Sequence, residues 1–475
     1  MSFARLWAVL AILLPALAAL IANLSSVDLA YHLRAGGDIL NRAGIPRADA
    51  WTFTALGQPW LDQQWGAQVI LATVYRLAGW TGLVLLRALL VGLLSALVLQ
   101  TCRVRGADLR RAAWLALSAF VVSAVALGLR PQLFGMVLLA LVLLVLALRR
   151  DRPRLMWAIP VIVAVWANLH GSFFLGPVVV GLAWLEDLAE RSPRAGETFA
   201  VGAVAALASL LNPFGPQVWA YAAGLSTNAE VTARITEWQP TTLRTVPGIL
   251  FFASALGVVV LLARRGARTS WPTLAWLGAF FVIGAYAIRG VAWWPLGAVF
   301  AVAPLVARQE PVERPLAPLA RRLNVVIVAA LVVAGIALLP VWRPTDPGLQ
   351  APSGVVGNAP PGITGALREQ ARDGDHLFNP QPWGSWFEFS FPTMLVALDS
   401  RIEVFPPEVW DDYEAVTQGR DGWQAILDRW GVTLVIVPAT DDAFRDRLIG
   451  DGWTSVHDDN DGSLMRRSTS KRAGT

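Results

Sequence analysis

The stretch that decides the fold class is FARLWAVLAILLPALAALIANLSSVDLAYHLRAGG, residues 3–37, in which an apolar run passes directly into a polar segment. The apolar part is about twenty residues long, the length that a helix needs to cross a hydrocarbon core of about 30 Å. The polar part places Asp28 and His32 four residues apart, so a helix beginning there would carry both side chains on one face. The sequence therefore predicts a membrane helix followed by a polar helix at the membrane surface.

The composition extends this prediction to the rest of the chain. The 475 residues are 55% hydrophobic and only 15% charged, and the mean hydropathy is +0.51, which is unlike a soluble protein of this length. The basic residues are almost all arginines beside apolar runs, so the high isoelectric point does not indicate nucleic-acid binding. The single cysteine, Cys102, excludes an intramolecular disulfide. We expect an α-helical polytopic membrane protein with no nucleic-acid partner.

Eleven apolar runs are predicted to cross the membrane. The first lacks a clear cleavage site and is interpreted as a signal anchor. Residues 66–79 are too short to cross and are amphipathic, so we expect a helix lying at the membrane interface. The predicted spans are residues 5–23, 80–101, 112–129, 134–148, 155–170, 173–187, 198–212, 249–263, 271–287, 291–307 and 323–341.

The arginines indicate the orientation of these spans, because cytoplasmic loops carry an excess of Lys and Arg. Every second loop is arginine-rich, and the loops between them are poor in arginine. The arginine-rich loops contain Arg103, Arg105, Arg110, Arg111, Arg149, Arg150, Arg152, Arg154, Arg191, Arg194, Arg264, Arg265, Arg268, Arg308, Arg314, Arg321 and Arg322. We therefore place the N-terminus in the cytoplasm, and residues 24–65, 213–248 and the chain after 342 outside the cell membrane.

The composition turns globular after the last span. Residues 342–363 are rich in Pro and Gly and are predicted to be a linker. Residues 364–467 alternate short apolar strands with amphipathic helices, which predicts a small α/β domain, and residues 468–475 are predicted to be a disordered tail. We expect strands at 376–379, 393–400 and 432–438, helices at 422–431 and at 441–450 with Gly450 as its cap, and edge strands at 453–459 and 462–468.

Polar side chains gather at the predicted outer ends of the spans. Hydrocarbon tolerates such groups only where protein or trapped water satisfies them, so their concentration on one side indicates a site. Arg87 lies about two turns inside its span and is predicted either to extend outward or to face a cavity. The candidates at the outer ends are Asp28, His32, Asp62, Arg130, Asn168, His170, Glu237, Trp238 and Arg289.

Each candidate also has a purely structural interpretation. Asp28, Asp38 and Asp49 are placed where an aspartate often caps a helix. His32 could serve packing alone, and Asn168 with His170 could form a structural polar knot. Arg130 and Arg289 could anchor their helices at the interface. These alternatives stay open at the level of the sequence.

Several motifs together resemble the GT-C superfamily of glycosyltransferases, which use polyprenyl-phosphate-linked sugars, and more narrowly a group of bacterial GT-C-like membrane proteins. The resemblance covers nearly the whole chain and includes the first outer loop with its aspartate. The motifs are DLAYHLRAGGDIL (28–40), IPRADAWTFTALGQPWLDQQW (45–65), RPQLF (130–134), WANLHGSF (166–173), EWQP (237–240), PWGSW (382–386) and ALDSRIEV (397–404).

The resemblance implies sugar transfer from a lipid phosphate to an extracytoplasmic acceptor in the cell envelope. Such a reaction needs a general base, which the resemblance assigns to Asp28 with Asp62 as the substitute. It also needs positive charge beside the departing phosphate, for which arginine is well suited. The expected substrate-binding residues are His32, Arg87, Arg130, Asn168, His170, Glu237, Trp238 and Arg289.

A metal requirement stays open at this stage. GT-C enzymes often carry two adjacent acidic residues in the first loop, whereas here Leu29 follows Asp28. A divalent cation, Mg or Mn, held by Asp28, His32 or His170 remains an alternative.

The predicted C-terminal domain has a polar set of its own, namely Asn379, Trp383, Asp399 and Arg401. Asp399 and Arg401 could form an ion pair that fastens the domain to the outer loops, or the set could bind the acceptor. Two other functions compete with an enzyme. One is a non-catalytic scaffold of an envelope-polysaccharide complex. The other is a transporter, against which the lack of polar groups near the bilayer midplane argues.

Overall fold

The computed structural model describes residues 1–475 except 43, 266–268, 308–316 and 468–475. The predicted tail and three of the orientation arginines, Arg268, Arg308 and Arg314, therefore lie outside the described residues. Contacts divide the chain into two compact units. The first, here called the helical unit, comprises residues 1–22 and 83–339, and the second, the α/β unit, comprises residues 23–82 and 340–475.

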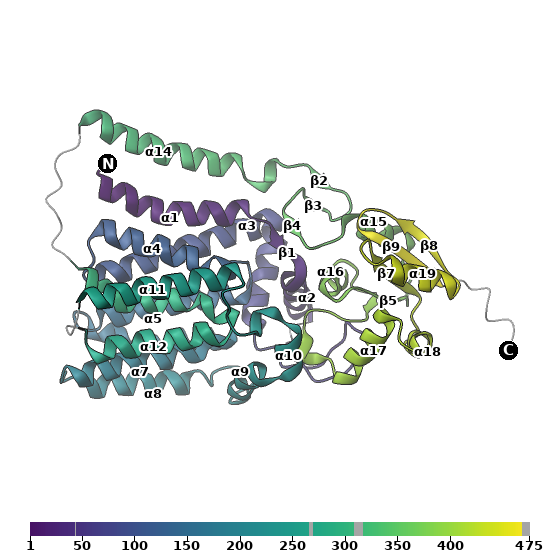
Figure 1. Ribbon diagram of the computed structural model, residues 1–475, viewed down its shortest axis with the longest axis horizontal. Coiled ribbons are helices and arrows are strands. Elements are labelled where there is room, and N and C mark those ends of the chain that lie inside the picture. The colour runs from purple at the N-terminus through teal and green to yellow at the C-terminus, as the bar shows by residue number, and fades with distance from the viewer. Residues whose placement is uncertain (43, 266–268, 308–316, 468–475) are drawn as a thin grey trace. The chain divides into compact units, whose positions relative to one another are not determined.

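The helical unit consists of long apolar helices that run alongside one another (Figure 1). Helix α1 packs against α4 and α14, and α7 packs against α8. The helices are α1 (Phe3–Ile21), the second part of α3 (Trp65–Val104), α4 (Leu109–Ser123), α5 (Pro131–Leu148), α6 (Ala158–Ala167), α7 (Leu175–Ala189), α8 (Ala195–Ala208), α9 (Gln217–Thr227), α10 (Ala229–Arg234), α11 (Val246–Arg265), α12 (Trp271–Tyr286), α13 (Trp294–Val302) and α14 (Pro318–Ala337). Short 3₁₀ turns extend several of them, namely η1 (Ala124–Ala126), η2 (Pro153–Trp157), η3 (Gly171–Phe174), η4 (Thr236–Trp238), η6 (Ile288–Ala292) and η7 (Ala303–Val306).

Each predicted span overlaps a helix, although several extend past its end, as 198–212 does beyond α8. Within the described residues, eight helical segments have the length and apolarity to cross a membrane, and three more are apolar but shorter. Burial separates the inner from the outer helices, since α5 and the segment 288–306 bury 72% and 78% of their apolar windows and α11 and α14 only 11%. The chain is therefore a membrane protein with several long apolar helices, and the number of crossings stays a prediction.

Several helices begin three to five residues before the predicted span. Helix α5 begins at Pro131 and α14 at Pro318, each with proline in the first turn. Proline suits that position because its fixed φ fits the helix and its missing N–H would have had no helical partner. The apolar run alone does not reveal this, because the first turn can be polar.

Helix α3 is broken at Gly79, whose backbone has φ 57° and ψ −152°. Residues with a Cβ atom rarely adopt such backbone angles because of steric clashes, whereas glycine adopts them at little cost. The break separates residues 65–78 from 80–104, close to the predicted boundary between the interfacial helix 66–79 and the span 80–101. Residues 65–82 of α3 belong to the α/β unit. The second segment of the helical unit begins at Leu83.

The α/β unit contains a five-stranded sheet in the order β6-β5-β7-β9-β8. Strands β6, β5 and β7 are parallel, and β9 is antiparallel to both β7 and β8. Phe378, Leu427, Val435 and Phe444 lie in the core of this part. The strands are β5 (His376–Phe378), β6 (Leu395–Val396), β7 (Leu434–Pro438), β8 (Trp453–Asp458) and β9 (Gly462–Arg467).

The remaining elements of the α/β unit come from both ends of the chain. Helix α2 packs on α16, and β1 before α2 pairs in parallel with β4. The helices are α2 (Ser26–Arg42), α15 (Pro361–Gln370), α16 (Gln381–Ser390), α17 (Pro407–Gln418), α18 (Trp423–Arg429) and α19 (Asp442–Gly450), with 3₁₀ turns η8 (Pro340–Trp342) and η9 (Ile402–Val404). The short strands are β1 (Leu24–Ser25), β2 (Thr345–Asp346), β3 (Ala351–Pro352) and β4 (Val356–Gly357).

The structure differs from the sequence-based expectation in three details. Strand β9 is not an edge strand, because β7 pairs with one side of it and β8 with the other. Gly450 is the last residue of α19, and Asp451 follows it as the cap. Residues 342–363, expected as a linker, contain the three short strands β2, β3 and β4.

The division into units also differs from the predicted one in content. The sequence grouped residues 24–79 with the membrane helices, whereas the structure places residues 23–82 in one compact unit with the C-terminal segment. The pairing of β1 with β4 and the packing of α2 on α16 are the contacts responsible. Both connect segments more than 300 residues apart, and local sequence patterns do not reveal such a pairing.

Candidate functional site

Asp28 lies in the first turn of α2, and His32 follows one turn later. The Asp28 side chain is half-buried, whereas His32 is only 2% exposed. A carboxylate in the first turn is stabilised by the positive end of the helix dipole. The hydroxyl of Ser26 makes no hydrogen bond among the described residues, so it does not cap the helix. Asp28 is thus the acidic group that α2 presents at its N-terminus.

Asp62 is buried beside His32 rather than presented to solvent. Its Oδ1 accepts a hydrogen bond of 2.7 Å from the Gln68 side-chain amide, and the same amide nitrogen lies 3.4 Å from His32 Nδ1. Burial raises the pKa of Asp62 to about 7, against the opposing effects of the Gln68 hydrogen bond and the charge of Arg401. The two predicted residues His32 and Asp62 are therefore brought together, through a glutamine that the sequence did not single out.

Tyr31, which follows Ala30 in α2, is influenced by the charges of Asp28, Asp62 and a third carboxyl group, that of Glu403 in η9. The Tyr31 ring lies against the His32 ring with 4.0 Å between centroids. Burial raises the Tyr31 pKa well above its usual value, and the negative charges of Asp28, Glu403 and Asp62 add to the rise. Carboxyls from three separate segments therefore act on one phenol. Glu403 lies in the ALDSRIEV motif, and its acidic side chain was the signal that could have identified it.

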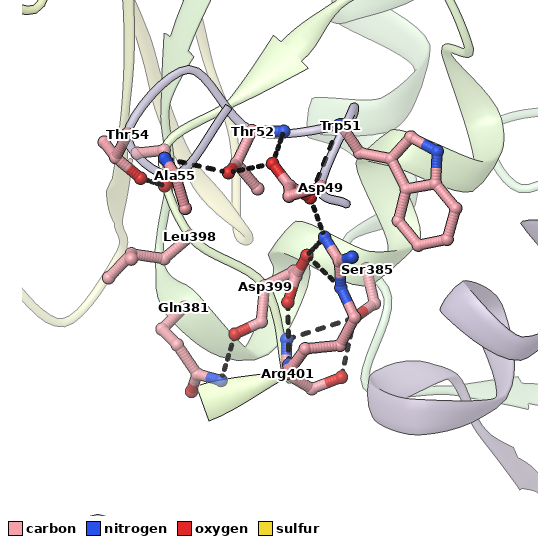
Figure 2. Close-up of polar contacts among 12 residues, drawn as sticks. Asp49, Trp51, Thr52, Thr54, Ala55, Gln381, Ser385, Leu398, Asp399 and Arg401 are labelled. Carbon is pink, nitrogen blue, oxygen red and sulfur yellow. Dashed lines mark hydrogen bonds and ion pairs between the residues drawn. The ribbon is translucent and has the colours of Figure 1, made fainter. Parts of the chain in front are cut away.

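Arg401 is buried, and Figure 2 shows its guanidinium beside the carboxyl groups of Asp399 and Asp49. Its guanidinium bonds to Asp399 and to Asp49 of the first predicted outer loop. The same group stacks on Trp51 and Trp60, with centroid distances of 4.3 and 4.7 Å. The pKa of Arg401 is raised, because the carboxylates, Asp399 foremost, outweigh the lowering effect of burial. This is the fastening ion pair that the sequence left as one of two alternatives.

Glu388 of α16 is a further buried carboxyl group near Arg401 and Asp399. Its side chain is 1% exposed, and neither carboxyl oxygen has a hydrogen-bond partner among the described residues. Burial and the negative charge of Asp399 raise its pKa well above the ordinary value for a glutamate. Glu388 stands between Phe387 and Phe389, and a single acid in such an apolar stretch was the signal available in the sequence.

The other predicted residues of the C-terminal segment lie on α16 and just before it. Asn379 is fully buried, and its amide bonds to the backbone of Ala397 and Leu398, next to β6. Trp383 is half-buried, with its ring 6.5 Å from that of Phe387. Asn379, Asp399 and Arg401 are thus occupied with holding backbone and loop in place, which leaves Trp383 as the most accessible of the four.

Within the helical unit, a second polar cluster forms around η4. Arg130, which precedes α5, pairs with Glu237 at 2.7 Å. Arg289 of η6 lies over the Trp238 ring, with 5.3 Å between its guanidinium carbon and the ring centroid. A backbone hydrogen bond from Ile288 to Gln239 holds the two turns together. The structure therefore brings together all four of these predicted residues.

The remaining predictions in the helical unit have local partners. His170 Nδ1 accepts a hydrogen bond from the backbone N–H of Ser172 and so caps η3. The Asn168 amide donates to the carbonyls of Ala164 and Leu211. Arg87 is 2% exposed and donates to the carbonyl of Ala22, just after α1. These contacts favour structural roles for the three side chains, although a role in binding remains a prediction.

The metal site that the sequence left open at Asp28, His32 or His170 stays a prediction. Nowhere in the described part of the chain do three or more His, Cys, Asp or Glu side chains lie so that they could hold a metal ion. His32 Nδ1 faces the Gln68 amide, and His170 Nδ1 faces Ser172. Each of these histidines thus has a protein partner at Nδ1, and metal dependence stays a prediction.

The fold is similar to that of an archaeal oligosaccharyltransferase, AglB of Archaeoglobus fulgidus. With the form tethered to an acceptor peptide containing the NVT sequon, the TM-score is 0.53 at 12% identity, covering 91% of this chain and 69% of that one. With the form bound to an inhibitory peptide and a dolichol-phosphate, the TM-score is 0.52 at 11% identity, covering 98% and 75%. No protein-family model and no curated protein sequence matches the chain.

Proposed function

We propose that this membrane protein, which shares the fold of a GT-C superfamily oligosaccharyltransferase, is itself a glycosyltransferase. The observation that carries the proposal is the extent of the likeness, which covers 91–98% of the chain and so includes the segments of both units. A fold hosts many functions, so the argument for this one rests on the residues at the site.

The proposed donor is a sugar linked to a polyprenyl phosphate. One similar structure holds a dolichol-phosphate, which belongs to this lipid class. A lipid-borne donor suits a chain with several long apolar helices, because such a substrate reaches the site from the membrane. The proposed acceptor is a hydroxyl group of an envelope glycan, lipid or protein, and one similar structure is tethered to an acceptor peptide.

Asp28 is the proposed general base. It would take the proton from the acceptor hydroxyl while the hydroxyl oxygen attacks the anomeric carbon and the bond from that carbon to the phosphate oxygen breaks. Asp28 is half-buried, so an acceptor can reach it, whereas Asp62 is 2% exposed and bonded to Gln68. Burial thus favours Asp28 over Asp62, its predicted substitute.

Arg130 and Arg289 are the proposed phosphate-binding residues. Negative charge grows on the departing phosphate, and a guanidinium offers a planar fork of donors for its oxygens. Arg130 already pairs with Glu237, and both side chains are about one-third exposed or less. Binding of a phosphate at Arg130 would therefore displace Glu237, which would then be free to contact a sugar hydroxyl.

The proposed location of the reaction is the extracytoplasmic side of the cell membrane. The support is the alternation of arginine-rich and arginine-poor loops, from which the sequence predicts that residues 24–65 and 213–248 are both extracytoplasmic. This orientation also fits a donor whose sugar is displayed outside the cytoplasm.

The experiment is to incubate the purified protein in lipid with a panel of radiolabelled polyprenyl-phosphate sugars and with extracted envelope material as acceptor. The proposal predicts label in the acceptor fraction and release of the polyprenyl phosphate in equal amount for at least one donor. Donor binding without transfer across the whole panel would favour a non-catalytic scaffold, and protein-dependent movement of an intact donor across vesicles would favour a transporter.

A further inference from the structure

The α/β unit contains a buried chain of three polar side chains, Asp62, Gln68 and His32, here called the Gln68 relay. The exposed fractions are 2% for Asp62, 0% for Gln68 and 2% for His32. Gln68 Nε2 lies 2.7 Å from Asp62 Oδ1 and 3.4 Å from His32 Nδ1. One amide nitrogen therefore faces both neighbours, and its two N–H groups suffice for both.

The charge on Asp62 decides how the Gln68 amide is oriented. An ionised carboxylate only accepts hydrogen bonds, so the group that faces Oδ1 must be the amide nitrogen and not its oxygen. The other N–H of that nitrogen then points to His32 Nδ1, which must accept it. A neutral imidazole that accepts at Nδ1 carries its proton on Nε2.

The packing around Gln68 keeps the amide in place. A Cβ atom built on Gly36 would lie 2.1 Å from the Gln68 backbone oxygen, so α2 and α3 approach each other as closely as glycine allows. The His32 ring is further held against Tyr31, with 4.0 Å between centroids. The amide oxygen of Gln68, Oε1, and the second carboxyl oxygen of Asp62, Oδ2, have no hydrogen-bond partner among the described residues.

We propose that Gln68 is a positioning residue that fixes the His32 imidazole in the tautomer with its proton on Nε2. In the Gln68 relay, His32 accepts a hydrogen bond at Nδ1 from Gln68 and is a hydrogen-bond donor at Nε2. That the recipient is a phosphate or sugar oxygen of the donor rests on the proposed function. The tautomer itself does not depend on it.

The relay explains why buried Asp62 is placed beside a glutamine. A carboxylate with only apolar neighbours would be costly, and Gln68 supplies one strong hydrogen bond to it. A hydrophobic residue at position 68 would satisfy the packing equally well but would leave Asp62 and His32 without this bond. The choice of glutamine therefore serves the two side chains that it joins.

Nitrogen-15 NMR of the histidine side chains tests the proposal without any enzyme assay. The chain has only four histidines, so histidine-selective labelling gives a small set of signals, and His32→Gln identifies the signal of interest. Spectra are recorded at about pH 8.5, where a free imidazole is neutral. In the wild-type protein we expect an unprotonated, hydrogen-bonded Nδ1 and a protonated Nε2 for His32.

Replacing the amide by a carboxyl should reverse the tautomer. In Gln68→Glu an oxygen faces His32 Nδ1, so His32 must donate there, and its Nδ1 signal should move to the protonated range. Gln68→Met, which offers neither donor nor acceptor of comparable strength, should shift the Nδ1 signal to that of a nitrogen without a hydrogen bond. Gln132→Glu makes the same change at a buried glutamine of α5 and should leave the His32 signals unchanged.

Two results would overturn the proposal. One is a wild-type His32 with its proton on Nδ1, and the other is a His32 spectrum that is the same in Gln68→Glu and Gln68→Met as in the wild type. The signals of His376 and His457 report in the same spectra whether each variant has folded, and the wild-type spectrum decides the matter even if Gln68→Glu does not fold. A protein that shows the expected tautomer but transfers no sugar would refute the proposed function and leave this inference standing.

Discussion

Arg401 and Asp49 form a buried ion pair although 352 residues separate them in the sequence. Asp49 belongs to the first predicted outer loop, and Arg401 follows strand β6 of the C-terminal segment. Asp399 shares the same guanidinium (Figure 2). The rings of Trp51 and Trp60 cover this group. The α/β unit therefore depends on a charged contact between the two ends of the chain.

Removal of Arg401 should destabilise the α/β unit strongly. Arg401→Met leaves two carboxylates buried without their partner, which costs about 3–5 kcal/mol in comparable buried pairs. The measurement is the free energy of unfolding by chemical denaturation in detergent. Arg429→Met removes an ion pair with Asp412 in which Arg429 is 60% exposed, and it should cost less than about 1 kcal/mol. Equal losses in the two variants would contradict the structural role assigned to Arg401.

The pKa of Asp62 predicts a specific pH dependence of stability. An acid whose pKa rises from 3.8 to about 7 on folding binds more protons in the folded state, so stability falls as pH rises through that interval. Asp62→Asn does not titrate, so the wild type should lose stability relative to this variant between about pH 4 and pH 7 and then run parallel to it. The rise sets an upper limit of about 4 kcal/mol on the change. Denaturation midpoints measured across this range check it, and parallel curves throughout would show that Asp62 has an ordinary pKa.

Two neighbouring glycines of α2 should respond in opposite ways to alanine. A Cβ atom on Gly36 would meet the backbone of Gln68 at 2.1 Å, so Gly36→Ala should cost about 1–3 kcal/mol or more by forcing α2 and α3 apart. A Cβ atom on Gly37 would lie 3.9 Å from Arg76 Nη2, which is an ordinary contact distance, and Gly37→Ala should gain about 0.5–1 kcal/mol. Thermal unfolding of both variants distinguishes them, and a Gly36→Ala protein as stable as the wild type would refute the close packing.

The predicted orientation can be measured with single cysteines. Cys102 is the only native cysteine and is fully buried, so background labelling should be low. In intact cells, a membrane-impermeant maleimide should label Gln58→Cys of the first predicted outer loop, because residue 58 is exposed. It should label Arg110→Cys, on a predicted cytoplasmic loop, only after the membrane is opened. The reverse pattern would place Asp28 in the cytoplasm.

The membrane helices were predictable from the sequence because, in a chain of this composition, a long apolar run forms a helix that can span the membrane. Their first turns were missed where proline begins the helix, as at Pro131 and Pro318. The predicted boundary between residues 66–79 and 80–101 lies at the break in α3, because the amphipathic and apolar parts of the sequence meet at Gly79. Local pattern was thus sufficient for the apolar helices and the break in α3, but not for the first turns.

The site was predictable only in part, because its contacts join distant segments. Asp28 and His32 share a helix turn and could be read together, and Arg130 and Glu237 were both singled out. Gln68 looked like any polar residue of an amphipathic helix, and only the close approach of α2 and α3 gives it two polar partners. The contact between Arg401 and Asp49 needed a pairing of chain ends that periodicity does not encode.

The central claim is that a carboxylate at the start of α2 performs sugar transfer. The most direct measurement is the initial rate of transfer from the best polyprenyl-phosphate donor by the wild type, by Asp28→Asn and by Asp38→Asn. Asp38 is a carboxylate on the same helix that pairs with Arg34, so it serves as the matched control. We expect the initial rate of transfer to fall at least about a hundredfold in Asp28→Asn, because a general base is lost. The rate of Asp38→Asn should be near that of the wild type. Undiminished transfer by the Asp28→Asn protein would contradict the central claim.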